Sequence, residues 1–166
     1  MPLKRIAALC GLLVAFTPTL LRAQIPKPKL SLNGGVTHYD FGSESDGTTG
    51  IGAVRLEVPL VLFVAEGSVG IFRPEINDEK STFIVPELQV QWQSTPIGIR
   101  PYVGLGVGWL HPTSGPGATE VTYSGSLGVR AGIPFFPLSV RAEARHRIRG
   151  SSFSRHATEL TLGVSW

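Results

Sequence analysis

The feature that most constrains the fold of this chain is a repeated alternation of apolar residues with polar or small ones. Eight such runs follow one another, and Gly and Pro fall mostly near their ends. A period of two is typical of β-strands, and no stretch after the N-terminal segment has a convincing helical period. The sequence therefore predicts an all-β chain. The predicted strands are Leu30–Phe41, Gly50–Val58, Val61–Phe72, Thr82–Gln93, Ile97–Leu110, Glu120–Ile133, Leu138–Ile148 and His156–Trp166.

The connections between the predicted strands alternate in length. Longer polar segments follow every odd-numbered strand, and tight turns follow the second, fourth and sixth. Long loops at one end and short turns at the other are typical of an up-and-down barrel, with both termini at the end of the short turns. The long connections are Gly42–Thr49, Arg73–Ser81, His111–Thr119 and Arg149–Arg155, and the tight ones are Pro59-Leu60, Ser94–Pro96 and Pro134–Pro137.

The two faces of the predicted strands differ in polarity. One face is almost free of charge over about 9–11 residues per strand, the length that crosses a bilayer. A soluble barrel has an apolar interior, whereas a transmembrane barrel is apolar outside, and an Arg facing the lipid midplane would cost roughly 2–4 kcal/mol. We therefore predict an eight-stranded antiparallel up-and-down transmembrane β-barrel with a polar interior network. The predicted interior residues are Arg55, Glu57, Glu66, Glu87, Arg100, Tyr102, Arg130, Arg141, Glu143, Arg145 and Glu159.

The predicted interior carries both signs of charge in similar numbers. An eight-stranded barrel is just wide enough for side chains to fill it, so we expect ion pairs and not an open pore. Arg145 should lie nearly opposite Glu159 across the last loop, and we predict that they pair. Arg130 and Arg141 should also lie nearly opposite one another, and two like charges there need acidic neighbours such as Glu143.

Prolines and glycines modify the predicted strands. Pro86 and Pro101 lie inside strands, where each removes a ladder hydrogen bond, so we expect a bulge or a local loss of pairing at both. Gly104, Gly106 and Gly108 lie on the polar face of the fifth strand, with no helix after them to form a phosphate-binding loop. We expect these glycines to make room for bulky Arg and Tyr side chains.

Five aromatic residues share the apolar face. Phe63, Trp92 and Trp166 lie near the short-turn ends of their strands, whereas Trp109 and Tyr123 lie near the long-loop ends. Amphipathic rings prefer the two membrane–water interfaces, so these residues predict two aromatic girdles. The alternative is that they are scattered surface aromatics of a soluble sandwich.

The N-terminal segment has the composition of a secretory signal peptide. Lys4 and Arg5 precede the apolar segment Ile6–Phe16. This segment is too short for a membrane-spanning helix, which needs about 20 residues. We expect residues 1–23 to be removed and residues 24–166 to form the barrel domain, with an uncleaved N-terminal anchor as the alternative.

The signal segment also accounts for the basic character of the chain. The sequence has 15 basic and 12 acidic residues, and three of the basic ones, Lys4, Arg5 and Arg22, lie in the signal. The remainder is balanced, so the charge does not indicate nucleic-acid binding. The single cysteine, Cys10, lies there as well. The mature chain then has no disulfide and no thiolate metal site.

The C-terminal strand resembles the assembly signal of bacterial outer-membrane proteins. That signal ends in an aromatic residue preceded by apolar residues at alternating positions, and Leu160, Leu162, Val164 and Trp166 match it. Together with the signal peptide and the eight runs, the chain resembles the small OmpA/OmpX-type barrels of Gram-negative bacteria. The resemblance implies residence in the cell outer membrane and insertion by the outer-membrane barrel assembly machinery.

Three classes of function remain open at this stage. We favour an integral barrel with a structural or surface-interaction role and no enzymatic activity. The alternatives are a lipid A-modifying enzyme resembling the outer-membrane deacylases and a soluble lipocalin-like carrier. A nucleophile, a base and an orienting acid would have to converge for catalysis, and the His-x-Ser-Asn block of the deacylases is absent. The residues that an enzyme could use are His38, His111, His146, His156, Ser151, Ser152, Ser154 and Glu159.

The long loops carry the charges that a partner would meet. Two loops are acidic and the last is basic. We favour the interpretation that they are simply solvated loops, with cation binding by the acidic loops as the alternative. We expect no cofactor and no bound metal. The expected partners are outer-membrane lipid and lipopolysaccharide, with no nucleic acid, and the expected state is a monomer. The loop charges are Glu44, Asp46, Glu75, Asp78, Glu79, Arg149 and Arg155.

Overall fold

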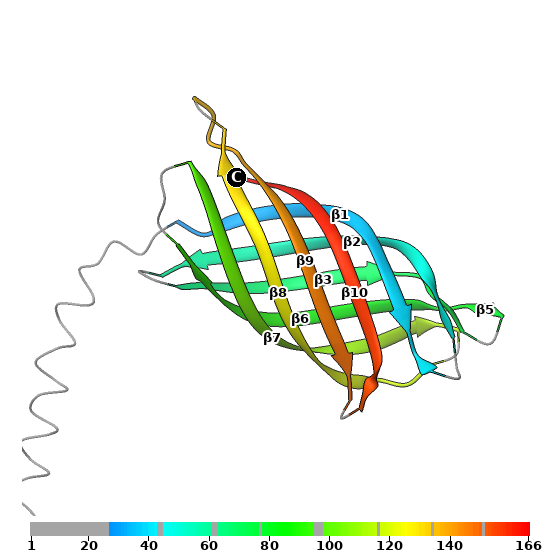
Figure 1. Cartoon of the computed structure of the whole chain (residues 1–166). Helices are drawn as coiled ribbons and strands as arrows, with labels where there is room; N and C mark the ends of the chain where they lie inside the picture. The colour runs from blue at the N-terminus through cyan, green and yellow to red at the C-terminus, as the bar shows by residue number, and fades with distance from the viewer. Residues whose placement is uncertain are drawn as a thin grey trace, which may run out of the picture.

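A computed structural model of the chain shows a closed barrel of eight antiparallel strands (Figure 1). It describes residues 27–42, 45–60, 63–76, 78–94, 98–115, 117–133, 135–150 and 152–166. The order around the barrel is β1-β10-β9-β8-β7-β6-β3-β2, and β2 closes the ring on β1. The barrel strands are β1 (Lys29–Asp40), β2 (Asp46–Pro59), β3 (Phe63–Phe72), β6 (Thr82–Gln93), β7 (Ile99–Ser114), β8 (Glu120–Gly132), β9 (Ser139–Arg149) and β10 (Ser152–Ser165).

The barrel has two distinct ends. The connections after β1, β3, β7 and β9 lie at one end, here called the loop end, and those after β2, β6 and β8 lie at the other, the turn end (Figure 1). Both ends of the described chain lie at the turn end, where the backbones of Leu30 and Trp166 exchange two hydrogen bonds. The predicted up-and-down topology is therefore confirmed, whereas the predicted signal peptide lies outside the described residues.

Strands extend further into the loop end than the alternation predicted. β2 begins at Asp46 and β7 continues to Ser114, because these residues pair with the ends of β1 and β6. Between β3 and β6 the chain also forms a small hairpin, β4 (Glu75–Ile76) with β5 (Glu79–Lys80), that was not predicted. These strand ends depend on pairing with the neighbouring strand, so the sequence of the strand itself does not predict them.

The two prolines behave differently. Val85 and Pro86 of β6 have no partner in the β6–β7 ladder, although the register is the same on both sides of this gap. The predicted local loss of pairing is therefore found there. At Pro101 the prediction is wrong, because the β7–β8 ladder runs through it without a bulge. Pro101 accepts a hydrogen bond from the Ser94 N–H just after β6 ends, so its missing N–H faces the end of a strand.

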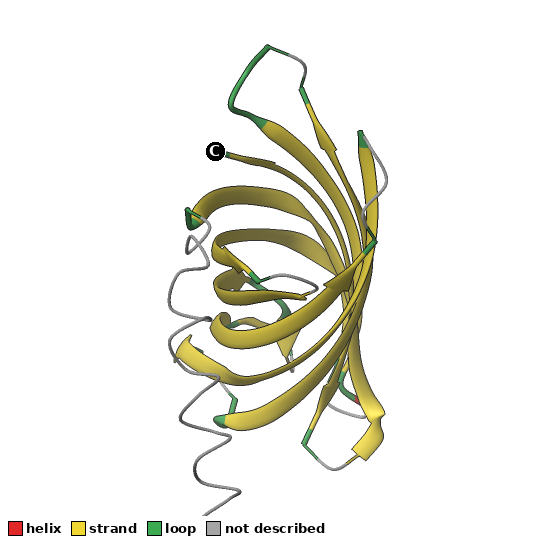
Figure 2. Ribbon diagram, turned by 90° about the vertical axis from the view of Figure 1, so that its left-hand side faces the viewer, coloured by secondary structure: helices red, strands yellow, loops and turns green. Residues whose placement is uncertain are grey.

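The outward face of the barrel is largely apolar on all eight strands, apart from polar residues near the loop end. Leu, Val, Ile and aromatic side chains stay about half exposed there, including Leu105 at 76% and Leu162 at 71%. Strands make up nearly all of the described ribbon, as Figure 2 shows. No helix in the described part of the chain has the length and apolar character to cross a membrane.

Candidate functional site

The interior of the barrel holds the chemically distinctive residues of the chain. The alternation of each strand directs every second side chain inward, and these side chains form two layers. Charged and amide side chains fill the middle and the turn end. Mostly apolar side chains fill the loop end, where the buried guanidinium of Arg149 lies 4.8 Å from the ring of Phe41. The buried side chains of the barrel interior therefore differ in composition between its two ends.

Arg141 of β9 is the centre of the charged layer. Its guanidinium lies 2.8 Å from a carboxylate oxygen of Glu57 and 2.6 Å from one of Glu66, and it also pairs with Glu143. Its Nε donates a 2.7 Å hydrogen bond to the hydroxyl of Tyr102. The Arg141 side chain is only 1% exposed. Several acceptors for one buried guanidinium offset the large cost of removing its charge from water.

Two further arginines extend the network toward the middle of the barrel. Arg145 lies 2.8 Å from Glu66, 2.6 Å from Glu87 and 3.0 Å from Glu143. Arg55 approaches the same Glu143 to 2.7 Å from the opposite wall. These contacts join β2, β3, β6 and β9 across the lumen.

Ion pairs balance the charge of this layer. The five arginines with ion pairs in it are Arg55, Arg130, Arg141, Arg145 and Arg147, and their partners are the five glutamates Glu57, Glu66, Glu87, Glu143 and Glu159. Buried unpaired charges are very costly, whereas paired and hydrogen-bonded ones are tolerated. The equal numbers therefore make the charged layer neutral as a set.

Tyr102 of β7 organises the turn end of the network. Its hydroxyl donates to Glu143 over 2.6 Å, and its ring lies 4.3 Å from the guanidinium carbon of Arg130 and 5.0 Å from that of Arg141. Facing it on β8 is Gly128, where an added Cβ would overlap the phenol ring. The close approach of Tyr102 to the wall thus requires glycine at position 128.

We expect Gly128→Val to lower the free energy of unfolding by about 1–3 kcal/mol, the usual cost of overpacking a filled core. The new side chain would displace Tyr102 from Arg141 and Glu143. The measurement is urea unfolding of the detergent-folded barrel. Gly125→Val is the matched control on the same strand, since a Cβ at Gly125 meets nothing within 4 Å. Equal destabilisation by both substitutions would contradict this packing role.

One predicted ion pair is replaced by another. Arg145 and Glu159 are direct register partners between β9 and β10, as expected. However, the ion-pair partner of Glu159 is Arg147, which also contacts Glu87 at 2.7 Å. Arg145 instead turns across the lumen to Glu66 and Glu87. Long Arg side chains reach neighbours two residues along a strand, so register alone does not determine the pairing.

The structure places ten of the eleven predicted interior residues inside and buried. Arg100 is the exception, because it is exposed at the turn end although its register partner is the buried Arg130. Arg147 was not among the predicted interior residues, yet it is buried within the network. Gln91 was not predicted, yet it donates a 2.9 Å hydrogen bond to Glu66 and also bonds Arg130.

The apolar layer at the loop end was not predicted. Phe72 and Phe83 stack there with ring centroids 5.8 Å apart, and Tyr39 and Phe41 pack at 5.3 Å. The Tyr39 hydroxyl accepts a 2.9 Å hydrogen bond from the Glu75 N–H, which ties β4 to the barrel mouth. The buried apolar cluster, here called the apolar plug, comprises Tyr39, Phe41, Ile51, Phe72, Ile76, Phe83, Val85, Leu110 and Ala157.

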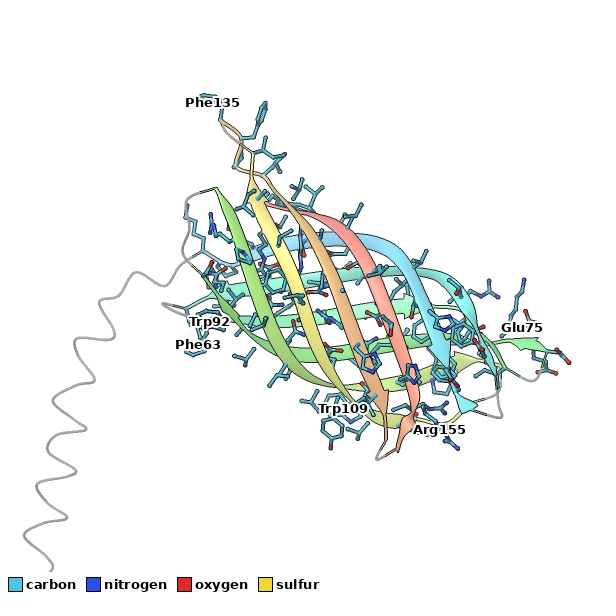
Figure 3. The ribbon with its side chains drawn as sticks, viewed as in Figure 1. Phe63, Glu75, Trp92, Trp109, Phe135 and Arg155 are labelled. Atoms are coloured by element: carbon cyan, nitrogen blue, oxygen red, sulfur yellow. The ribbon has the colours of Figure 1, made fainter. Side chains whose placement is uncertain are left out.

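The predicted girdle and assembly residues all lie on the outside. Phe63 and Trp92 are register partners at the turn end, and Trp109 lies toward the loop end (Figure 3). Trp166 and Tyr123 are 48% and 55% exposed. The remaining residues of the C-terminal pattern, Leu160, Leu162 and Val164, are exposed on the same outer face.

Among the described residues, the acid considered for catalysis does not meet the two histidines near the last loop. His146 and His156 face outward and pack against each other with ring centroids 5.2 Å apart, whereas Glu159 faces inward and pairs with Arg147. The wall of the barrel therefore separates this carboxylate from both imidazoles. The serine side chains at positions 151, 152 and 154 lie outside the described set. Among the described residues, no group of three or more His, Asp or Glu could hold a metal ion.

Comparisons with known proteins agree with this geometry at the level of the fold. The sequence matches no protein-family model and no curated protein. Neisserial surface protein A is similar in structure, with a TM-score of 0.67 at 10% identity over 83% of this chain and 95% of that chain. The N-terminal barrel of Pseudomonas aeruginosa OprF has a TM-score of 0.54 at 12% identity, over 83% of this chain and 97% of that chain.

A third solved structure, Ail of Yersinia pestis, gives a TM-score of 0.56 at 8% identity, covering 84% of this chain and 97% of that chain. All three are small eight-stranded outer-membrane barrels. Identities this low establish shared architecture and nothing about ligands or partners. The chain has the fold of the small eight-stranded outer-membrane β-barrels.

Proposed function

We propose that this protein is an integral outer-membrane barrel, a monomer with a structural or surface-interaction role, and neither a pore nor an enzyme. In this proposal the loop end faces the cell exterior and the turn end faces the periplasm. Exposed loops at one end and short turns at the other are the usual arrangement in bacterial outer membranes. Lipopolysaccharide and outer-membrane lipid are then the surroundings of its apolar face.

A single observation carries the proposal: the charged side chains are inside and the apolar ones are outside. Arg55 is 1% exposed within the lumen, whereas Leu127 is 62% exposed on the wall. A soluble carrier requires the opposite arrangement, with an apolar lumen to receive its ligand. The neutral charged layer and the apolar plug together fill the lumen, which supports a sealed barrel.

The test is the behaviour of the mature protein in isolated outer membranes. Small folded barrels resist SDS until they are boiled, so a change in gel migration on heating is expected in the outer-membrane fraction. In planar lipid bilayers the purified protein is expected to give no channel steps. Recovery in the periplasm without a heat-dependent shift would refute the membrane assignment, and regular channel steps would refute the sealed interior.

The proposal includes recognition of the last strand by the outer-membrane assembly machinery. We expect Trp166→Ala to lower the amount of folded barrel in cells several-fold, while refolding of the purified variant in detergent is retained. Trp92→Ala removes an equally exposed girdle residue, 52% against 48%, and is the matched control. Immunoblots of heated and unheated outer membranes measure both. Equal losses for the two variants would assign Trp166 to the girdle alone.

A further inference from the structure

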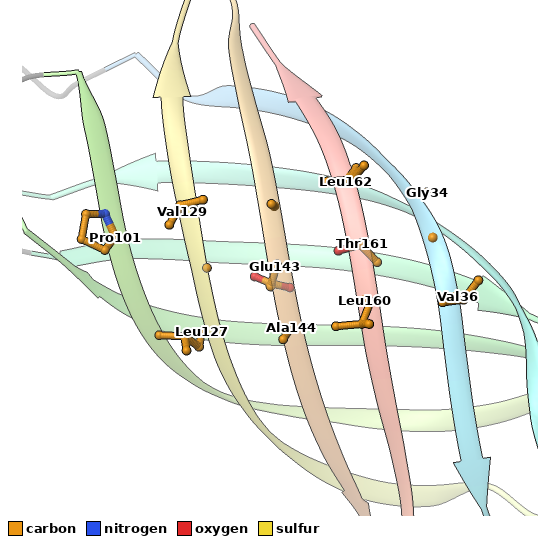
Figure 4. Close-up of a pocket in the computed structure, with 13 residues that line it drawn as sticks. Gly34, Val36, Pro101, Leu127, Val129, Glu143, Ala144, Leu160, Thr161 and Leu162 are labelled. Carbon is orange, nitrogen blue, oxygen red and sulfur yellow. The ribbon is translucent and has the colours of Figure 1, made fainter.

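An apolar groove lies on the outer wall over β8, β9, β10 and β1 (Figure 4). Ala142 and Ala144 of β9 form its floor, and the taller Leu127, Leu160 and Leu162 flank them on β8 and β10. Its volume is about 680 Å³. The groove runs along the strands between two rows of larger side chains. This shape suits a single extended acyl chain lying against the wall.

The end of the groove toward the loop end meets a polar row on the same outer face. Beyond Val36, Leu160 and Ala144, the next outward positions are His38, Thr158 and His146, which are register partners across β1, β10 and β9. His146 Nδ1 lies 3.0 Å from the Thr158 hydroxyl. One row further out, Asp46, Asp40 and His156 are register partners across β2, β1 and β10. The groove therefore leads directly into titratable side chains.

The depth of this polar patch matches a membrane interface. His156 of β10 and Trp166, which directly follows β10, both face outward and are ten residues apart. At about 3.4 Å per residue and a tilt of about 40°, that separation covers about 25 Å, the height of the apolar band of a transmembrane barrel. With Trp166 at the periplasmic interface, His156 lies at the level of the outer headgroups, and the groove lies among the acyl chains.

A second groove on the opposite wall has an apolar row next to it in place of the polar row. It has a volume of about 660 Å³ and lies over β2, β3, β6 and β7, with Ala65 in its floor. The next outward residues toward the loop end are Val54, Val69, Pro86 and Trp109. Of these two grooves, the one over β8 to β1 has polar side chains in the row directly next to it, whereas on the other wall outward polar side chains such as His111 lie farther toward the loop end.

The patch combines carboxylate acceptors with imidazole groups, and His38 Nε2 lies 4.0 Å from a carboxylate oxygen of Asp46. Asp46 and Asp40 provide carboxylates on β2 and β1, whereas His156 and His146 provide imidazoles on β10 and β9. Asp40 and His156 are direct register partners, and neighbouring strands lie about 5 Å apart. No hydrogen bond or ion pair to the ring nitrogens of His156 is found within the described residues.

We propose that this surface is a binding site for a zwitterionic phospholipid of the phosphatidylethanolamine type. One acyl chain lies in the groove, the phosphate accepts hydrogen bonds from His146 and His156, and the ammonium group faces Asp40 and Asp46. A headgroup with only negative charge meets the same imidazoles but is repelled by the two carboxylates. The inference rests on the proposed membrane location, since the groove faces lipid only there.

The test is native mass spectrometry of the folded barrel with equal amounts of phosphatidylethanolamine and phosphatidylglycerol carrying the same acyl chains. We expect about fivefold more bound phosphatidylethanolamine, the factor that corresponds to one partly exposed ion pair. The double variant Asp40→Asn/Asp46→Asn should bring the ratio to about one. An equal ratio in the wild type, or a preference for phosphatidylglycerol or lipid A, would overturn the proposal.

Groove occupancy is tested separately. Ala144→Leu fills the groove and should lower binding of both phospholipids several-fold, whereas Ala65→Leu in the second groove should leave binding unchanged. Both substitutions keep an apolar side chain on the lipid face, so folding should persist and heat-dependent gel migration verifies it. Equal binding by the two variants would overturn the groove assignment. Absence of the wild type from the membrane fraction would instead refute the proposed function.

Discussion

Replacing Arg141 by Met is expected to lower the free energy of unfolding of the barrel by about 3–5 kcal/mol, the usual cost of breaking a buried ion pair from one side. Methionine has a similar length but no charge. It would leave Glu57, Glu66 and Glu143 facing one another without the guanidinium that now contacts all three. The measurement is urea unfolding in lipid vesicles or detergent, with the midpoint and slope both recorded.

Arg100→Met is the matched control, because Arg100 belongs to the same inward face but is exposed at the turn end. Its unfolding free energy should equal that of the wild type. The double variant Arg141→Met/Glu57→Gln removes one charge of each sign and should be less destabilised than Arg141→Met alone. If the double variant loses as much unfolding free energy as the two single variants together, charge balance in the network does not matter.

The alternation of residues was sufficient to predict the architecture of the barrel. Once Arg55, Glu87 and Glu143 are assigned to one face, the period of two assigns every other residue of their strands, and the cost of a charge in lipid determines which face is inside. Strand ends were less predictable. Asp46 and Gly47 resemble a loop, and they are part of β2 because Asp40 and Tyr39 of β1 pair with them.

The contents of the lumen could be predicted only in part. Whether Glu159 pairs with Arg145 or Arg147 depends on the paths of long side chains across the lumen, and a strand pattern contains no such information. The apolar plug was missed for a different reason. Phe72, Phe83 and Leu110 occupy inward-facing positions in the alternation of their strands. They were missed because apolar residues were assigned to the lipid-facing side. The alternation itself could have predicted their inward position.

Phe83→Ala is expected to lower the free energy of unfolding by about 3–5 kcal/mol, because it removes a ring from a filled core and leaves a cavity. Phe83 is 0% exposed and stacks on Phe72. Phe135→Ala in the turn after β8 is the matched control, since Phe135 is fully exposed and its loss should leave the unfolding free energy unchanged. Urea unfolding of both variants gives the comparison.

Phe83→Ala also tests whether the plug and the charged layer are independent barriers. Arg145, Glu87 and Glu66 lie deeper in the lumen and keep their contacts when the ring is removed. The variant should therefore remain without channel steps in planar bilayers even though it is less stable. Channel steps from this single substitution would mean that the charged layer passes ions and that the apolar plug alone seals the barrel. Loss of stability without conductance would mean that the charged layer keeps the lumen closed without the Phe83 ring.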